Sequence, residues 1–334
     1  GEWLSLGKLN AGSKDFGYRF SGSYVDQFAD DTVGIALAVS HMMSPSQFTR
    51  FEAWGYPTTG SGDAIIGGVK PHVVSSELTR TAVMATVEWK PSDAVSSAID
   101  VFYTKFKDNQ IKRGIEFPLY WSGAQLQPGY TAEDGFVTAG QFNDVKGVIR
   151  NDANRRDADL VSIGWNVSAG NDVLHATFDA NYSMVKRTDL IIETYSGTGR
   201  AGVGATDNMG FTMTDRGIMF NSKLNYADSA TIGVTSPQGW GSDIVPGGQD
   251  GYYNDRHIKD EILALRFGAE RDLGGGFRSL ELGFNYSGRV KTLTPDEYFL
   301  SAAASANGTK TVPIPSEYLL SPTALDFIGV SGMV

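Results

Sequence analysis

The chain has 334 residues and no cysteine, which excludes disulfide bonds, thiolate metal sites and cysteine nucleophiles. It also lacks any run of eighteen or more apolar residues, so the sequence predicts no transmembrane helix. Basic residues are in the minority: 28 Lys and Arg stand against 38 Asp and Glu, and the formal net charge is −10. Because the phosphates of nucleic acids require a basic surface, we expect no nucleic-acid partner.

Motifs for catalysis and cofactor binding are scarce as well. The four histidines form neither H-x-x-H nor H-E-x-x-H, and no G-x-S-x-G occurs. A formal G-x-G-x-x-G spans 197–202, but the residues after it have no helical period, so we interpret it as a loop tip. The aspartates of 151–157 (NDANRRD) lack EF-hand spacing and favour an ion-pair cluster over a calcium site. We therefore expect no enzymatic activity, no cofactor and no metal site.

Glycine and aromatic residues are abundant, and apolar residues recur at every second position. In the stretch 174–184, Leu174, Phe178 and Tyr182 lie on one face, whereas Asp179 and Asn181 lie on the other. The same period of two occurs in 16–24, 32–41, 82–89, 158–170, 261–270 and 279–288. This pattern predicts β-strands with one apolar and one polar face.

The expected strands come in pairs joined by short turns, and long polar stretches separate the pairs. Turn residues occupy 28–32, 90–93, 168–172 and 271–276, and the long polar stretches are roughly 43–80, 107–156, 187–259 and 293–334. Alternating short turns and long loops are typical of outer-membrane barrels. We predict an all-β, antiparallel transmembrane β-barrel with long extracellular loops, of which this chain supplies about eight or nine strands. The alternative from pattern alone is a soluble β-sandwich.

Two stretches carry a resemblance to a known family. Residues 12–56, with YRFSGSYVDQFADDTVGIALAVS and a following SPSQ, resemble the first barrel strands of TonB-dependent outer-membrane receptors of sphingomonads and Caulobacter-like bacteria. Residues 213–262 are similar to the long extracellular loops of that family. The resemblance implies that residues 1–334 form part of a receptor barrel in the bacterial outer membrane, in contact with its lipid. It also implies active uptake of a nutrient, driven by TonB through a plug domain.

The family's TonB box, plug domain and C-terminal strand ending in an aromatic residue do not occur within these residues. Barrels of the family that this chain resembles have 22 strands. We therefore expect the chain to be the N-terminal portion of a barrel and a piece of a longer protein. A sheet of eight or nine strands leaves two unpaired edges, which lipid cannot satisfy.

The long loops contain aromatic residues next to glycine, proline and acids. Sugars bind by stacking on Trp or Tyr while carboxylates take their hydroxyl groups. We therefore expect a carbohydrate, small or oligomeric, to contact Trp54, Tyr56, Tyr120, Trp121, Trp240, Asp243, Asp250, Tyr252 and Tyr253. The competing interpretation of any one aromatic residue is packing between loops or anchoring at the membrane interface.

Other functions remain open from the sequence. A ferric-siderophore receptor would use arginines for an anionic chelate, and the third long stretch contains Arg187, Arg200, Arg216 and Arg256. A passive porin-like barrel or a soluble glycan-binding β-domain are the further alternatives.

Overall fold

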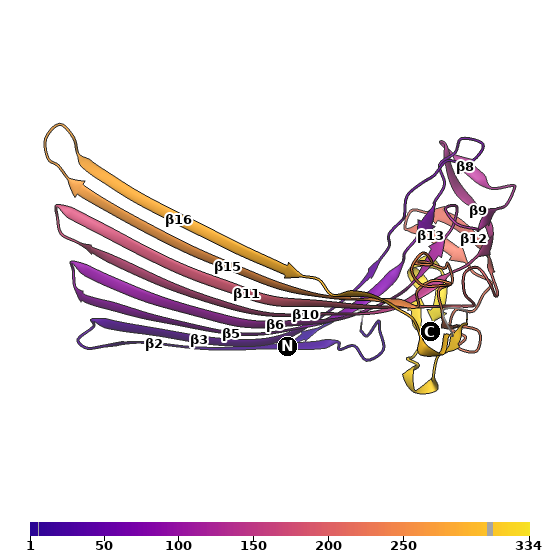
Figure 1. Cartoon of the computed structure of the whole chain (residues 1–334), viewed down its shortest axis with the longest axis horizontal. Helices are drawn as coiled ribbons and strands as arrows, with labels where there is room; N and C mark the ends of the chain where they lie inside the picture. The colour runs from indigo at the N-terminus through magenta and orange to yellow at the C-terminus, as the bar shows by residue number, and fades with distance from the viewer. Residues whose placement is uncertain (6, 306–309) are drawn as a thin grey trace.

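The computed structural model describes residues 1–5, 7–305 and 310–334, and it is an all-β protein with antiparallel sheets. Eight long strands of 13 to 24 residues dominate the largest sheet (Figure 1). They are β2 (Phe16–Phe28), β3 (Val33–Arg50), β5 (His72–Ser92), β6 (Val95–Pro118), β10 (Val148–Gly170), β11 (Leu174–Gly197), β15 (Gly251–Asp272) and β16 (Ser279–Thr294). The predicted all-β, antiparallel fold is confirmed.

Each long strand pairs with the next long strand along the chain, in an up-and-down order from β2 to β16. The sheet curves, and its far sides are β2 and β16 (Figure 1). Of these two edge strands, β2 has a further partner at its start, β1 (Glu2–Trp3), and β16 has none within the described residues. No sheet formed by the described residues closes on itself.

The strands continue much further than the apolar pattern indicates. The pairing of β3 with β5 runs on to Arg50 and His72, and that of β6 with β10 runs on to Glu116 and Val148. The first three long polar stretches are therefore strand at both of their ends, and the connections between the long strands shrink to 51–71, 119–147 and 198–250. Backbone hydrogen bonds hold a strand together whatever its side chains are, so polar residues on both faces conceal strand from a hydrophobicity pattern.

The short turns lie where the sequence predicts them, at one end of the sheet (Figure 1). The first turn is unusual because Ala29, Asp30 and Asp31 all have positive φ angles, of 54°, 54° and 64°. Thr32 stabilises this conformation, since its backbone N–H and its hydroxyl both donate to the carbonyl of Ala29, at 3.2 and 2.7 Å. Two aspartates tolerate the left-handed region better than most residues do.

The strand register places mainly apolar residues side by side across all eight long strands. One continuous row joins Tyr24, Leu37, Ala85, Val101 and Ile163, and Tyr182, Leu263 and Gly288 extend it. We call the side of the sheet that carries this row the apolar face. The opposite side, which carries Asp100, Asn166, Asp179 and Arg266, is the polar face.

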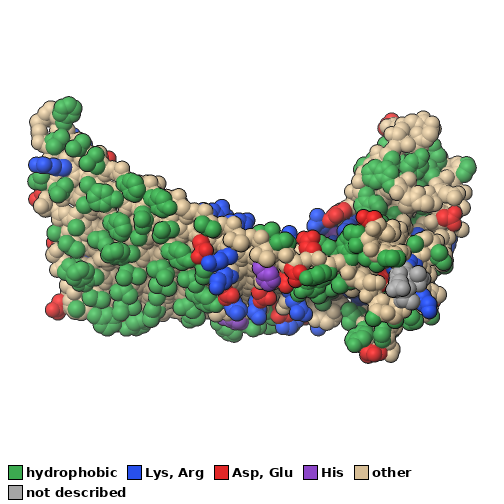
Figure 2. Space-filling view, in the orientation of Figure 1, with side chains coloured by type: hydrophobic (Ala, Val, Ile, Leu, Met, Phe, Trp, Pro, Cys, Tyr) green, Lys and Arg blue, Asp and Glu red, His purple; other side chains and the backbone are tan. Residues whose placement is uncertain are grey.

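The apolar face is exposed over the half of the sheet next to the short turns. Phe284 is 61% exposed, Leu282 65% and Trp165 46%, values far above those of core residues. Figure 2 shows apolar side chains gathered over this half, followed by a band of charged side chains across the middle of the strands. An apolar patch this large on a protein surface indicates a partner that removes it from water.

The buried core lies at the other end, among the connections. Its centre includes Phe117 at the end of β6, Phe142 of β9 and Phe220 of β13. The shorter elements there are β4 (Gly68–Val69), β7 (Gln125–Leu126), β8 (Thr131–Glu133), β9 (Phe136–Val145), β12 (Asp207–Thr214), β13 (Gly217–Asn221), β14 (Gly233–Val234), β17 (Glu297–Leu300), η1 (Ala303–Ser305), β18 (Val312–Pro313), η2 (Ser316–Tyr318), β19 (Thr323–Leu325), η3 (Asp326–Ile328) and β20 (Val330–Met333). In the described ranges, helices are 3₁₀ turns of three residues, and none has the length or apolarity to cross a membrane.

The position of this core leads to a stability prediction. Phe117 is completely buried, and its ring lies 5.5 Å from the rings of Phe220 and Tyr226. Phe117→Ala should lower the free energy of unfolding by about 3–5 kcal/mol through lost burial and the remaining cavity. The matched control is Phe277→Ala in the last short turn, where the side chain is 79% exposed. Urea unfolding followed by fluorescence measures both; equal effects would contradict a core located among the connections.

Candidate functional site on the polar face

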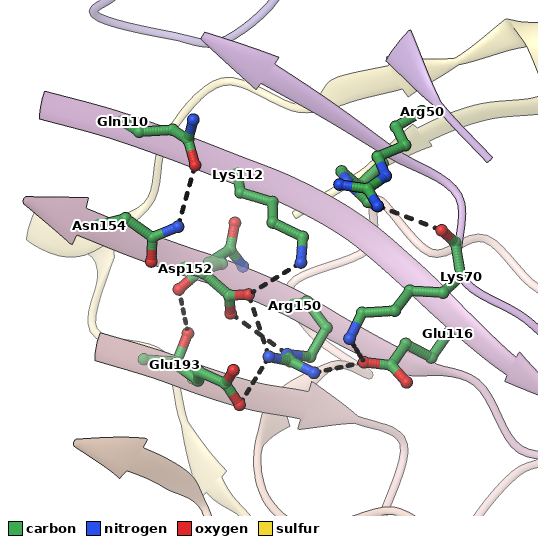
Figure 3. Close-up of polar contacts among 12 residues, drawn as sticks. Arg50, Lys70, Gln110, Lys112, Glu116, Arg150, Asp152, Asn154 and Glu193 are labelled. Carbon is green, nitrogen blue, oxygen red and sulfur yellow. Dashed lines mark hydrogen bonds and ion pairs between the residues drawn. The ribbon is translucent and has the colours of Figure 1, made fainter. Parts of the chain in front are cut away.

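A buried arginine organises the polar face where the long strands enter the region of the connections. Arg150 of β10 forms ion pairs with Glu116 of β6, with Asp152 of its own strand at 3.0 Å and with Glu193 of β11 at 2.7 Å (Figure 3). The Arg150 side chain is only 5% exposed. The register explains the convergence, because Glu116, Arg150 and Glu193 alternate onto the polar face of adjacent paired strands.

Two lysines complete this group, which we call the Arg150 cluster. Lys70 lies 3.3 Å from Glu116, and Lys112 lies 3.8 Å from Asp152 (Figure 3). The cluster then has three cations and three carboxylates, so its charges balance. Such balance is required because an unpaired charge at this depth costs several kcal/mol.

Burial shifts the protonation equilibria of the cluster. Burial raises the pKa of Asp152 to about 6, although the positive charge of Arg150 opposes the shift. Burial also lowers the pKa of Lys112, and Lys70 adds to this effect by repulsion. For Arg150, burial alone would lower the pKa, but Asp152, Glu193 and Glu116 together raise it above its usual value.

Aromatic rings adjoin the Arg150 cluster. The guanidinium of Arg150 lies 4.8 Å from the ring centre of Tyr195, a cation–π contact. The Tyr195 hydroxyl donates to Glu193 at 2.9 Å and accepts from Gln249 at 3.0 Å. Burial raises the pKa of Tyr195, and the negative charge of Glu193 adds to this increase, so the hydroxyl stays protonated. The ring of Trp240 meets Tyr195 edge-on at 5.9 Å, which joins a predicted site residue to the cluster.

The three predicted tryptophans lie near one another, and two of them cover a strip of glycines. Trp54 is 6.2 Å from Trp240 between ring centres, and its ring lies against Gly68. Trp121 covers Gly67, and it also covers Gly55 next to Trp54. A Cβ atom on Gly67 would come within 2.7 Å of the Trp121 ring, so the glycines are needed for this contact. We call Trp54, Trp121 and Trp240 the tryptophan patch; Trp121 is 54% exposed.

The other predicted ligand contacts are dispersed. Tyr120 packs against the buried core, and Tyr56 pairs with Phe136 at 5.4 Å while it is 52% exposed. Asp243 is exposed on the connection between β11 and β15. Asp250 is buried, forms an ion pair with Arg200 and accepts the backbone N–H of Ala302 at 2.8 Å. Its carboxylate therefore fastens two segments to each other.

Tyr252 and Tyr253 are adjacent in β15, so their side chains lie on opposite faces of the sheet. Tyr252 stands directly opposite Glu193 in the register and shares the polar face with the Arg150 cluster. Its ring contacts Phe299 of β17 at 6.1 Å. Tyr253 pairs with Tyr298 at 6.0 Å on the apolar face. Only Tyr252 of the two belongs with the site.

A cleft of about 170 Å³ continues the polar face toward the short turns. It is lined by Asp108, Gln110, Asn154, Arg156, Asp189 and Arg256 among others. Asp189 is held by two arginines, since Arg156 and Arg187 each donate to its Oδ1 atom at 2.8 Å. The charged residues of 151–157, expected to form one solvated ion-pair cluster, instead form separate pairs. Asp152 is buried in the Arg150 cluster, Arg156 pairs with Asp189 at this cleft, and Asp157 pairs with Lys107 at 3.6 Å.

The arrangement suits recognition of a polar ligand. Within the part of the chain that the structure describes, no group of three or more His, Asp or Glu residues is placed to hold a metal ion. The tryptophan patch offers apolar ring faces, and Glu193, with a side chain 25% exposed, offers carboxylate oxygens beside Tyr252. Stacking surfaces next to acceptors of hydrogen bonds are the elements that bind a hydroxyl-rich ring.

Sequence reasoning missed the Arg150 cluster. Its members come from separate segments: Glu116 and Arg150 are 34 positions apart, and Glu193 is a further 43 away. Only the strand register brings them together, and the sequence pattern did not extend the strands this far. One usable signal is the run of charged residues on both faces in 148–159, which is unusual for a strand unless its partners carry opposite charges.

No family model, no curated protein and no solved structure matches this chain.

The Arg150 cluster leads to a pH-dependent prediction. Arg150→Gln leaves Glu116, Asp152 and Glu193 without their shared cation and should destabilise the protein by about 3–5 kcal/mol at pH 7.5. Without Arg150, the folded-state pKa of Asp152 rises further above its unfolded value of 3.8. The folded state then binds more protons than the unfolded state below neutral pH, so the deficit shrinks as the pH falls to 5.

The measurement is the urea unfolding midpoint of the variant and of the parent at pH 7.5 and at pH 5. Arg155→Gln is the matched control, because Arg155 lies on the same strand but is exposed and belongs to the apolar face. A deficit that is equal at both pH values would refute the assigned role of Arg150.

Proposed function

We propose that this chain forms part of the wall and outer binding surface of a TonB-dependent receptor barrel. The proposed receptor lies in the outer membrane and takes up a carbohydrate nutrient by active transport. The observation that carries the proposal is the two-faced sheet. Its apolar face is exposed over the half next to the short turns, while the polar face carries hydrogen-bonding and charged groups throughout.

The height of the exposed apolar region fits a bilayer. On β11 the apolar face runs from Leu174 near the turn to Met184, and on β16 it runs from Leu280 to Val290, eleven positions in each case. A tilted strand needs about nine to eleven residues to cross the hydrocarbon core. In β-sandwiches, by contrast, the apolar face of a sheet is covered by a second sheet.

The open sides of the sheet support a role as one part of a larger wall. Lipid offers no hydrogen bonds to the free backbone groups of β2 and β16, so spanning sheets in membranes close into barrels. We infer that further strands of the complete protein pair with these two edges. As in the resembling family, a plug would fill the lumen against the polar face and connect the receptor to TonB.

The class of ligand is inferred from which arginines are already neutralised by ion pairs. In the resembling family an anionic chelate would require free cations, but Arg200 is paired with Asp250, and Arg156 and Arg187 are paired with Asp189. The Arg150 cluster is balanced as well. The tryptophan patch and Glu193 favour a neutral, hydroxyl-rich ligand over a ferric siderophore. The siderophore remains the second candidate, because Arg216 and Arg256 form no ion pair within the described ranges.

Transport tests this function directly. Cells that express the complete protein should take up a labelled oligosaccharide, and an uncoupler of the proton gradient should abolish the uptake. Trp240→Ala should weaken binding by about 1–2 kcal/mol, or roughly 5- to 30-fold, because it removes a stacking surface. Tyr318→Ala is the control, since this ring is 74% exposed and stands outside the site. Uncoupler-insensitive uptake would identify a passive porin, and iron-chelate uptake would identify a siderophore receptor.

Location in the membrane can be tested residue by residue, because the absence of cysteine permits single-cysteine labelling without background. Leu263→Cys and Ala264→Cys place a nitroxide on the apolar and on the polar face of β15. In bilayers, the label at 263 should collide with oxygen more than with a water-soluble nickel complex, and the label at 264 should show the reverse. Equal exposure of both labels to the nickel complex would exclude a bilayer around this face.

A further inference from the structure

Beside the exposed apolar region, a row of lysines crosses the same face of the sheet. Lys105 of β6, Lys186 of β11 and Lys259 of β15 lie in one row, and Asp159 of β10 stands between the first two. We name these four residues the lysine row. We propose that the lysine row binds phosphorylated lipid headgroups at the edge of the bilayer, an inference that rests on the membrane location proposed above.

The position of the row fixes what can reach it. The neighbouring row toward the short turns contains Tyr103, Val161 and Met184, with Glu261 at its β15 end, and the row beyond that contains Ile163 and Leu263. The lysines therefore begin where the exposed apolar region of this face ends. If that region contacts acyl chains, the lysines lie at the depth of the headgroups. Figure 2 shows a band of charged side chains at this boundary, across the middle of the strands.

The charge arrangement within the row calls for an anion. Lys186 and Lys259 are directly opposite each other on paired strands, and like charges in that position destabilise a sheet. No ion pair is formed by Lys186 within the described residues. A phosphate group between these two lysines would convert the repulsion into two charge-assisted contacts.

The two carboxylates beside these lysines are shared between a lysine and a tyrosine hydroxyl. Asp159 accepts the hydroxyl of Tyr103 at 2.8 Å and is 4.0 Å from Lys105. Glu261 accepts the hydroxyl of Tyr182 at 2.8 Å and pairs with Lys259 at 2.9 Å. Both acids are thus drawn toward tyrosines at the border of the apolar region. Lys105 and Lys259 nevertheless keep about half of their side-chain surface exposed, 49% and 47%.

The wider surroundings support a lipid rather than a soluble anion. The next row away from the apolar region contains Lys107 and Asp157, which pair with each other at 3.6 Å, and His257. Lys107 is thus neutralised within its own row, whereas the lysine row holds three lysines and one aspartate, in a chain with a net charge of −10. A narrow basic row bounded by apolar surface complements an amphiphile with an anionic head, because each part of such a lipid meets its own counterpart.

The test uses the complete protein reconstituted in dioleoylphosphatidylcholine bilayers with trace spin-labelled lipids. Electron paramagnetic resonance separates lipids immobilised on the protein from mobile ones, and so measures headgroup preference. We expect spin-labelled phosphatidic acid to be preferred over phosphatidylcholine by about 3- to 5-fold. The triple variant Lys105→Gln, Lys186→Gln and Lys259→Gln should reduce this preference to about 1, as should high salt.

Lys291→Gln is the matched control. Lys291 is exposed on β16, next to the position that extends the lysine row, but it lies on the polar face. Its removal should leave the preference unchanged. Lys186→Gln alone, which removes one side of the like-charge pair, guards against misfolding of the triple variant and should lower the preference partially.

The outcomes separate the two proposals. Immobilised lipid without a headgroup preference, or a preference that survives the triple variant, overturns the lysine row as a lipid site and leaves the receptor proposal standing. The absence of any immobilised lipid overturns both. A preference lost equally in Lys291→Gln would show a general charge effect and would also refute the assigned site.

Discussion

The structure depends on unbroken backbone pairing along strands of up to 24 residues. Since side chains alternate with a period of two, a register that is fixed at the short turns also fixes which face each residue occupies far away among the connections. The pairing of β6 with β10 runs in one register from Val95 and Ala169 near the turns to Glu116 and Val148. The same hydrogen bonds therefore set the apolar face at one end and the Arg150 cluster at the other.

The two ends of the sheet use different stabilising interactions. Near the turns, Leu282 and Phe284 remain exposed, so the sheet there depends on its backbone pairing and on the proposed lipid. Among the connections, Phe117 and its neighbours form a buried core, and Arg150 compensates three carboxylates at the same level on the polar face. The tryptophan patch is connected to the Arg150 cluster, because Trp240 contacts Tyr195, which in turn contacts Arg150. Tyr195 therefore contacts both the ion pairs and the aromatic rings.

The sequence predicts the turn-side half of the fold well, for a physical reason. There, one face is apolar and the other polar, as in the segment from Leu174 to Met184, and the pattern is visible without any knowledge of the partners. Beyond this region both faces are polar, and strands such as the continuation of β3 to Arg50 have no hydrophobic signature. Their existence depends on neighbouring strands, which a single-sequence pattern does not contain.

The candidate site was predicted in part for the same reason. Aromatic residues next to glycine mark Trp54, Trp121 and Trp240, which do come together. Asp250 has the right chemistry for a ligand contact, but its partner Arg200 is 50 positions away in the sequence, and the ion pair buries it. Arg150 was missed altogether, since its role is defined by carboxylates on two other strands. Composition identifies residue types that can bind, whereas burial and pairing decide which of them are free to do so.

The division of the long strands into an exposed apolar half and a specifically packed half has an evolutionary consequence. A side chain such as Leu282 has to be apolar but has no fixed neighbour to fit, whereas Phe117 must match the shapes of Phe220 and Tyr226. Substitutions should accumulate freely on the apolar face among residues of similar hydropathy. The connections, in contrast, should change as whole units, so that recombination between related genes at the strand midpoints can exchange one recognition surface for another.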